Sequence, residues 1–266
     1  MTGIQGYNLG EINCKAAFTS EFALDYDGPL QNVVNMQEQE RRQMDDRPGM
    51  YLKYLPCRYD AVTGSLLVGG GYLFDSQDHV KEYVDWTTHT FEVGEGETKS
   101  KFWSRPLFKD VKHRCWDVIG ACNFTLPDQH DVIRFQRWTY SEEGAADAAT
   151  LLKKMYPKIR DTAKKQGSGA IWLLIRPSDQ LIGLVTASSR TNSDSHMTGY
   201  RSIADLERQP PFDEHFPSNL RYALVYDRIS FLLTIWLPLS RRAGGVPQVT
   251  PNFPLLPAVT LPPQTT

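Results

Sequence analysis

The chain has 266 residues, of which 41% are hydrophobic and 23% charged, so it has a globular composition that excludes wholesale disorder. Its 29 Lys and Arg residues nearly balance 31 Asp and Glu residues, and this lack of basic excess argues against a nucleic-acid partner. No apolar run reaches the ~18–20 residues that cross a bilayer, so no membrane partner is expected. The first residues lack a signal-peptide pattern, and we therefore expect a cytoplasmic protein.

The first half of the chain has the apolar periodicity of alternating strands and helices. It predicts a strand over 16–25, a helix over 30–45, strands over 50–60 and 65–75, an amphipathic helix over 78–91 and a strand over 115–125. The Arg-Pro-Gly sequence at 47–49 is expected to end the first helix, because proline cannot continue it. The resulting order is β-α-β-β-α-β.

The second half repeats this order. Strands are predicted over 132–140, 170–176, 181–188 and 228–237, with a helix over 145–166 and a weaker helical region near 199–208. A β-α-β-β-α-β unit is typical of a ferredoxin-like fold, whose two helices cover one face of the sheet. Because the last strand is apolar on both faces, the second sheet face must also be covered.

We therefore predict an α+β fold of two fused ferredoxin-like βαββαβ repeats that form a dimeric-α/β-barrel-like pseudo-dimer. The N-terminal repeat spans 1–126 and is expected to hold the substrate cavity, and the C-terminal repeat spans 127–243. Residues 244–266 form a Pro-rich tail, and a further homodimer is possible. The alternative is two separate α/β domains, but the join at 127–131 is short for a free linker.

Several common site signatures are absent from the sequence. The four cysteines (14, 57, 115 and 122) form no C-x-x-C pair, and the six histidines have no zinc-site spacing, so no metal is expected. Scattered cysteines in a cytosolic chain are most often small buried hydrophobic residues. The glycine-rich dinucleotide, P-loop and nucleophile-elbow motifs are also missing.

Two features of the first repeat indicate a site for a flat ligand. Three consecutive glycines at 69–71 weaken a strand, but they let a bulky molecule approach the sheet, unless they mark a bulge or tight packing. Aromatic rings crowd the same repeat and can line a slot for a polycyclic substrate, although several must belong to the core. The predicted substrate-binding residues are Tyr72, Phe74, Tyr83, Trp86, Trp103, Trp116 and Asn123.

Three basic residues are the candidate catalytic groups. Arg105 lies in a loop at 101–108 that has no counterpart of that length in the second repeat, and its guanidinium can pair with a phenolate or enolate oxygen. His89 follows Trp86 by about one helical turn, and His113 precedes the last strand of the repeat. A neutral histidine can accept a phenol proton near pH 7, whereas the plainer alternative for all three is a solvated or structural role. Replacing Arg105 or His89 by Ala is expected to lower turnover far more than stability.

Longer stretches of the chain resemble a known family. These are AAFTSEFALDYDGPL, QEQERRQMDDRPGMYLKYLPCRYD, GGGYLFD, the FWSRP loop, WDVIGACNF, FQRWTY and FLLTIWLPLSRRAGG, and the resemblance extends over most of residues 14–245. They look like the antibiotic-biosynthesis-monooxygenase type of dimeric α/β-barrel protein. More closely, they resemble the B-ring-opening oxygenases of angucycline pathways of the jadomycin, gilvocarcin and kinamycin type.

The resemblance implies oxidative C–C bond cleavage of a polycyclic quinone or hydroquinone without a metal. It implies O2 and reduced flavin (FADH2 or FMNH2) as co-reactants, the flavin being diffusible and supplied by a partner flavin reductase; its binding residues are unknown. Two alternatives remain open: a non-oxidative polyketide cyclase or aromatase on the same barrel, and a haem-binding or other ligand-binding barrel.

Overall fold

The computed structural model describes residues 8–44, 46–60, 62–94, 96, 99–127, 130–141, 147–189, 212–216, 218, 220–236 and 238. The chain divides into two compact units. The first comprises Met1–Tyr7, Ala16–Cys115 and Leu232–Thr266, and the second comprises Asn8–Lys15 and Trp116–Phe231. The helical region predicted near 199–208 and the tail predicted at 244–266 lie outside the described residues.

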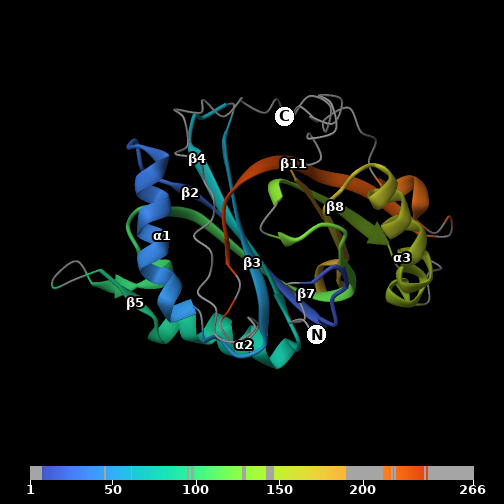
Figure 1. The fold of residues 1–266 in the computed structure, drawn as a ribbon, viewed down its shortest axis with the longest axis horizontal. Helices are drawn as coiled ribbons and strands as arrows, with labels where there is room; N and C mark the ends of the chain where they lie inside the picture. Colours follow the sequence, from blue (N-terminus) through green and yellow to red (C-terminus); the bar gives the residue numbers. More distant parts are fainter. Residues whose placement is uncertain are drawn as a thin grey trace. The chain divides into compact units, whose positions relative to one another are not determined.

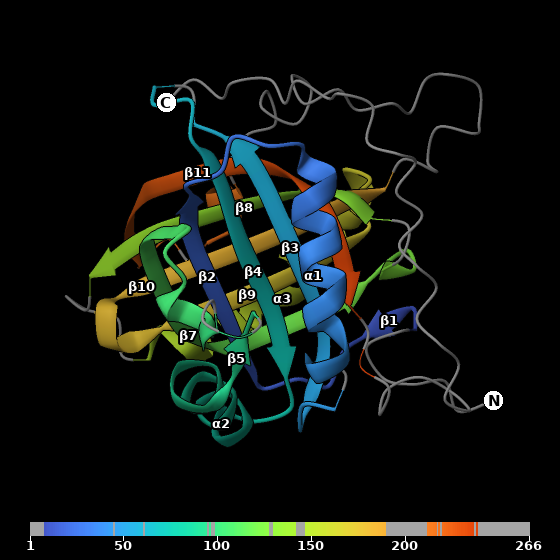
Figure 2. The same cartoon turned by 90° about the vertical axis from the view of Figure 1, so that its left-hand side faces the viewer.

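The first unit contains the β-α-β-β-α-β order that the sequence predicts. Its elements are β2 (Ala16–Leu24), α1 (Leu30–Met44), β3 (Met50–Tyr59), β4 (Leu66–Phe74), α2 (Gln77–Asp85), the short strands β5 (Glu92–Val93) and β6 (Ser100–Lys101), and the first half of β7 (Phe108–Asn123). The strands lie in the order β7-β2-β4-β3. Figure 2 shows α1 alongside β3.

The register of this sheet places residues from three strands in one row. Tyr72 on β4 is paired with Phe18 on β2 and with Lys53 on β3. Directly opposed residues share a sheet face, so these three side chains project to the same side. The ring of Tyr83 on α2 packs on Phe18 and Tyr72, with centroids 5.6 and 5.1 Å away, which identifies this side as the face covered by a helix.

The second predicted helix begins as an α-helix and ends as a π-helix, η1 (Trp86–Thr90). Ser76 caps its start by accepting a hydrogen bond from the His79 backbone N–H at 3.3 Å. Near its end, the Thr87 hydroxyl donates to the Tyr83 carbonyl at 2.9 Å. Single π-helical turns of this kind recur at functional sites. Here the wider turn changes which side chains at the end of the helix point to the same side.

The glycine run in β4 is explained by neighbouring protein atoms at two of its positions. A Cβ on Gly69 would lie 2.6 Å from the Ser20 carbonyl oxygen of the adjacent strand. A Cβ on Gly70 would overlap the Tyr72 ring and lie 2.9 Å from Ser20 Oγ. The space beside Gly69 and Gly70 is therefore filled by the protein itself, so tight packing, the plainer of the two interpretations, applies to them.

The second unit contains a similar set of elements. They are β1 (Gly10–Glu11), the second half of β7, β8 (His130–Ser141), α3 (Ala148–Lys165), β9 (Ala170–Arg176), β10 (Leu181–Ser189) and most of β11 (Arg221–Trp236). The strands lie in the order β11-β8-β10-β9, and residues Asp117–Asn123 of β7 pair with β9. Figure 1 labels α3, β7, β8 and β11, and Figure 2 labels β1, β9 and β10 as well.

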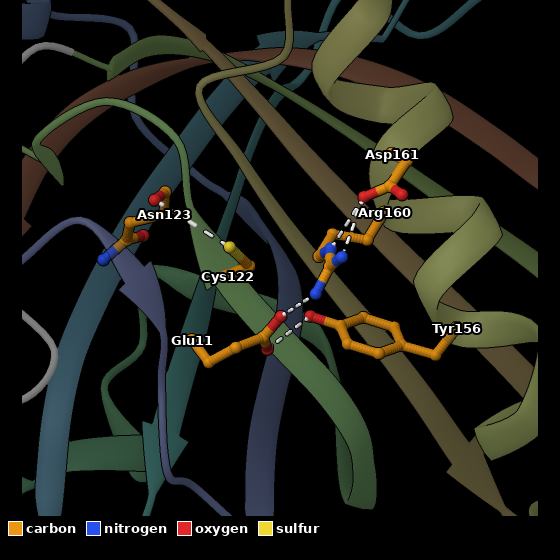
Figure 3. A network of polar contacts seen from close by, with 6 residues as sticks. All are labelled: Glu11, Cys122, Asn123, Tyr156, Arg160 and Asp161. Carbon is orange, nitrogen blue, oxygen red and sulfur yellow. Dashed lines mark hydrogen bonds and ion pairs between the residues drawn. The ribbon is translucent and has the colours of Figure 1, made fainter.

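A small polar network ties the N-terminal strand of the second unit to its helix (Figure 3). Glu11 on β1 accepts a hydrogen bond from the Tyr156 hydroxyl at 3.0 Å and pairs with Arg160 Nη1 at 2.7 Å, both on α3. Gly120 on β7 leaves room for the Tyr156 ring, which a Cβ at that position would overlap. The network explains how a two-residue strand is held in place.

The strand bounds and the cysteines can be compared with the predictions from the sequence. Strand β9 has the predicted bounds, whereas β7 and β11 each begin seven residues earlier than predicted, at Phe108 and Arg221. None of the four cysteines, all within the described part of the chain, forms a disulfide; Cys14, Cys57 and Cys122 are buried, as predicted, whereas Cys115 is half-buried. None of the helices in the described part of the chain is both long and apolar enough to cross a membrane.

Candidate functional site

The imidazole of His113 on β7 lies in an aromatic edge of the first unit. Its ring centroid is 4.2 Å from that of Trp103 and 5.3 Å from that of Phe18. Partial burial lowers the pKa of His113 below its ordinary value of 6.5, so the ring is neutral at pH 7. Its Nε2 atom is buried and has no hydrogen-bond partner among the described residues. A neutral imidazole with a free nitrogen is able to accept a proton.

Trp103 is fixed next to His113 by the widened end of α2. Its indole N–H donates to the Thr87 hydroxyl at 2.9 Å, and that hydroxyl donates in turn to the Tyr83 carbonyl. Trp103, His113 and Phe108 are only half-buried, whereas the rings behind them are buried. We call Trp103, His113 and Phe108, together with the fully buried Phe18 ring behind them, the aromatic edge. Its three half-buried rings are the part of this cluster that a molecule from solvent meets first.

Behind the aromatic edge, Arg105 forms a buried ion pair. Its guanidinium donates a short hydrogen bond to Glu40 on α1, and both side chains are at most 7% exposed. The guanidinium also lies 4.1 Å from the Phe108 ring centroid, and its Nε–H donates to the Phe102 carbonyl at 3.1 Å. Arg105 is therefore not a surface residue, and much of its hydrogen-bonding capacity is used within the protein.

Lys53 adds a second cation to this buried group. Its Nζ lies 5.0 Å from the Tyr72 ring centroid, and the side chain is 2% exposed. Burial lowers the pKa of Lys53 to about 7, an effect that Glu40 opposes and Arg105 reinforces. Burial likewise raises the pKa of Glu40, while Arg105 and Lys53 lower it. Arg105 stays protonated at all ordinary pH values, so Lys53 is the cation of the group that titrates near neutrality.

The buried side-chain atoms of the first unit that have no hydrogen-bond partner among the described residues include two uncharged oxygens. They are the Ser20 hydroxyl oxygen on β2 and the Gln37 side-chain oxygen on α1. Ser20 lies two residues after Phe18 on the same strand face, and Gln37 lies one helical turn before Glu40. A buried polar atom without a partner carries a desolvation cost of ~1–3 kcal/mol. We call Lys53, Glu40, Arg105, Ser20 and Gln37 the buried polar group.

Most of the residues predicted from the sequence lie in or beside these two groups. Trp103, Arg105 and His113 are members of them, and the Tyr72 ring packs on both Phe18 and Lys53. Tyr72, Phe74 and Tyr83 are at most 2% exposed and form a packed core. Trp86 stacks on Phe91 with centroids 4.3 Å apart. These buried rings are thus in contact with one another, and they do not line an open slot.

His89, Trp116 and Asn123 are not among these neighbours. The π-helix directs His89 to solvent, where its side chain is 70% exposed and lies 3.9 Å from Asp85, so it does not share the packed face of Trp86. Trp116 and Asn123 belong to the second unit. There, Trp116 packs on Phe135, and the Asn123 side chain donates to the Asn8 carbonyl at 3.2 Å.

The sequence analysis missed Lys53, Glu40, Ser20 and Gln37. One signal for Lys53 is present, because a lysine interrupts an apolar run from Met50 to Leu55 that is buried throughout. A charged residue in such a run is rarely buried without a partner. Glu40 gives no such signal, because it lies in a polar helix among other charged residues.

No group of three or more His, Cys, Asp and Glu side chains within the described ranges is arranged to hold a metal ion. No family model matches the chain, and no curated protein matches it.

Solved structures do resemble the chain. A "putative monooxygenase" from Fusobacterium nucleatum subsp. nucleatum has a TM-score of 0.50 at 8% identity, covering 89% of this chain and 96% of that one. A second protein of that description, from Lactobacillus acidophilus, has a TM-score of 0.50 at 10% identity, covering 84% and 96%. An anthrone oxidase-like protein has a TM-score of 0.48 at 10% identity, covering 88% and 95%. The first two show that this chain has an α+β fold of the dimeric α/β-barrel type.

Proposed function

We propose that the protein is an oxygenase that cleaves a C–C bond of a polycyclic phenol or hydroquinone, on a fused pair of ferredoxin-like repeats. The main support for this proposal is the position of His113. This neutral histidine lies beside Trp103, and its Nε2 has no hydrogen-bond partner among the described residues. The two structures of similar fold named as monooxygenases support the reaction class. The sequence resemblance to angucycline B-ring-opening oxygenases supports the substrate class.

The residues of the aromatic edge suit the first steps of such a reaction. Trp103 and Phe108 offer ring surfaces on which a flat aromatic molecule can stack. His113 Nε2 is buried in this structure, so it can accept the proton of a substrate hydroxyl, leaving a phenolate, once the side chains that cover it move aside. A phenolate is electron-rich enough to react with dioxygen when water is excluded from around it. One oxygen atom is inserted into the C–C bond, which breaks as two C–O bonds form, and the other leaves as water with two electrons and two protons from a reduced flavin that a partner reductase supplies.

The experiment that tests the proposal is turnover of an angucycline quinone with reduced flavin in air. We expect a ring-opened product whose mass includes oxygen from labelled dioxygen, and matching oxygen consumption. His113→Gln is expected to abolish most turnover. His89→Gln, the same substitution at the exposed end of η1, is the matched control and is expected to leave turnover unchanged. Conversion without oxygen consumption would instead identify the cyclase alternative, and an intense Soret band in the purified protein would identify a haem protein.

A further inference from the structure

The nitrogen that the proposed function uses is closed off from solvent. His113 Nε2 is buried, although the imidazole as a whole is only half-buried. Among the described residues, two rings pack on this imidazole: Trp103, with centroids 4.2 Å apart, and Phe18, with centroids 5.3 Å apart. Phe18 is fully buried, and its ring packs on Tyr72 and Tyr83 in the core. Trp103 is half-buried, so of the two rings only the indole has solvent beside it into which it can move.

The backbone around Trp103 is fixed on both sides. Trp103 lies in a single 3₁₀ turn, η3 (Phe102–Ser104). Before it, the Phe102 backbone N–H donates to the Phe91 carbonyl at 2.9 Å, and the two rings stack with centroids 5.2 Å apart. After it, the buried Arg105 side chain is bound to Glu40. The loop is therefore anchored, and movement of the indole has to come from rotation of the Trp103 side chain itself.

A hydrogen bond holds the Trp103 side chain in its present position. The indole has one donor, the Nε1–H, and it donates to the Thr87 hydroxyl at 2.9 Å. Thr87 is 0% exposed, and its own hydroxyl proton is donated to the Tyr83 carbonyl, so η1 fixes the acceptor in place. A rotation that carries the indole away from His113 also moves its N–H away from Thr87 and breaks this bond. The loss of one such bond changes an equilibrium by only ~2–10-fold, because its net contribution in water is small.

We propose that Trp103 is a gate over His113 and that Thr87 is the positioning residue that keeps this gate closed. Rotation of the indole exposes Nε2 to a substrate hydroxyl, and only ring contacts and the hydrogen bond to Thr87 are broken. This inference rests on the proposed function, because it states how the same site is opened. It also gives the π-helical turn a role, since that turn brings the Thr87 hydroxyl to the indole.

Acylation of histidine measures access to Nε2 without substrate, flavin or turnover. Diethyl pyrocarbonate transfers an ethoxycarbonyl group to an unprotonated imidazole nitrogen and releases ethanol and carbon dioxide. His113 is neutral at pH 7 because burial lowers its pKa, so access and not protonation limits its reaction. Long-range proton–nitrogen NMR spectra of protein with isotope-labelled histidine distinguish Nε2 from Nδ1, and His113→Gln assigns the signals. In the wild-type protein we expect Nε2 of His113 to react at least ~10-fold more slowly than Nε2 of the 70% exposed His89, because only the open fraction reacts.

Three variants test the hydrogen bond from the Thr87 side. Thr87→Val replaces the hydroxyl by a methyl group of similar shape, and we expect the His113 rate to rise ~2–10-fold, the factor that one hydrogen bond contributes. Thr87→Ser retains a hydroxyl and should keep the wild-type rate. Thr88→Val is the matched control, because the Thr88 hydroxyl donates to the Val84 carbonyl at 2.6 Å, whereas the indole N–H is bound to Thr87. This control should also leave the rate unchanged.

The same bond is tested from the Trp103 side. Trp103→Phe keeps an aromatic ring but removes the N–H, so the rate at His113 should rise at least as much as in Thr87→Val. If the two side chains act through this bond, Thr87→Val adds little in the Trp103→Phe background. A Thr87→Val effect of the same size in both backgrounds would come from a general loosening of η1 and would overturn the proposal.

Two further results would overturn the proposal: a wild-type His113 Nε2 that reacts as fast as that of His89, or an unchanged rate in Thr87→Val. Should Thr87→Val not fold, Trp103→Phe decides, and an unchanged rate in that variant has the same meaning. The outcome is separable from that of the proposed function. Absence of oxygenation with Thr87-dependent access would remove the proposed function and leave the gate, whereas oxygenation with access that does not depend on Thr87 would remove the gate alone.

Discussion

The rings of His113 and Trp103 lie 4.2 Å apart at an interplanar angle of 60°, and the indole N–H points away from the imidazole, to the Thr87 hydroxyl 2.9 Å away. Trp103 therefore shields one side of the imidazole without using its Nε2. A π-helical turn supplies Thr87, so the widened end of α2 has a direct part in forming the site.

The first prediction concerns the pH dependence of turnover. Because burial lowers the pKa of His113, its neutral form is present down to a lower pH than for a histidine in water. We expect kcat/KM to be independent of His113 ionisation above pH 6.5 and to fall on an acid limb below it. His113→Gln should lower kcat by about 10²–10⁴-fold and remove this limb. Oxygen consumption measured from pH 5 to pH 8 provides the test, and an acid limb that persists in the variant would assign it to another group.

The second prediction separates stability from catalysis at Arg105. Replacing Arg105 by Met leaves the Glu40 carboxylate buried without its guanidinium, with Lys53 as its remaining cation. We expect the free energy of unfolding to fall by about 3 kcal/mol, since breaking a buried pair leaves an uncompensated charge. This differs from the expectation from the sequence that turnover would suffer far more than stability.

The double variant Arg105→Met/Glu40→Met is the control for this effect, measured by urea unfolding. Removing both charges together should recover most of the lost stability, because apolar groups of similar volume replace a buried pair at little cost. Additive losses in the double variant would show that the two side chains do not act as a pair.

The periodicity of apolar residues along the sequence predicted most of the fold, but it predicted only part of the candidate site. Runs such as Ala170–Arg176 are apolar and short, and the helix over Ala148–Lys165 has one apolar stripe, so local pattern suffices for them. Arg105 and His113 were found because each is conspicuous in its own segment. The Glu40–Arg105 pair joins residues 65 positions apart, and no local pattern encodes which carboxylate a buried guanidinium will meet.

The glycine run left two interpretations open in the sequence for a related reason. A sequence shows that side chains are missing at 69–71, but it does not show what occupies the space that they leave. At Gly70 the occupants are the Tyr72 ring, two residues further along the same strand, and the Ser20 hydroxyl of the neighbouring strand. Glycine here permits close packing of protein on protein.

The third prediction follows from that packing. Gly70→Ala places a Cβ where the Tyr72 ring lies, and relieving the overlap requires the ring or the strand to shift. We expect the free energy of unfolding to fall by about 1–3 kcal/mol, as for other overpacked cores. The same substitution in a Tyr72→Ala background should cost less, because the ring that it meets is gone. Equal costs in the two backgrounds, measured by urea unfolding, would show that the Tyr72 ring is not the obstacle.

The fourth prediction concerns stability in acid and a histidine outside the proposed site. His130 on β8 is 3% exposed, and burial lowers its pKa to about 4, although hydrogen bonds involving the Gly169 and Thr125 backbones raise it. In the unfolded chain its pKa returns to about 6.5, so between these values the unfolded state binds the additional proton. The contribution of His130 to stability is therefore complete above pH 6.5 and is lost as pH falls toward 4. At ~1.4 kcal/mol per pKa unit, we expect a loss of about 3 kcal/mol.

Urea unfolding at pH 7, 5.5 and 4.5 measures this loss. His130→Gln has no titrating group at this position, so its stability should decline less steeply over the same range, and the difference between the two proteins isolates the histidine from all other titrating groups. The variant retains a polar side chain that can reach Thr125, whose hydroxyl lies 3.0 Å from His130 Nε2 in the wild-type protein. Parallel declines would mean that His130 is not buried as a neutral ring, because a solvated histidine has the same pKa in both states and contributes no such dependence.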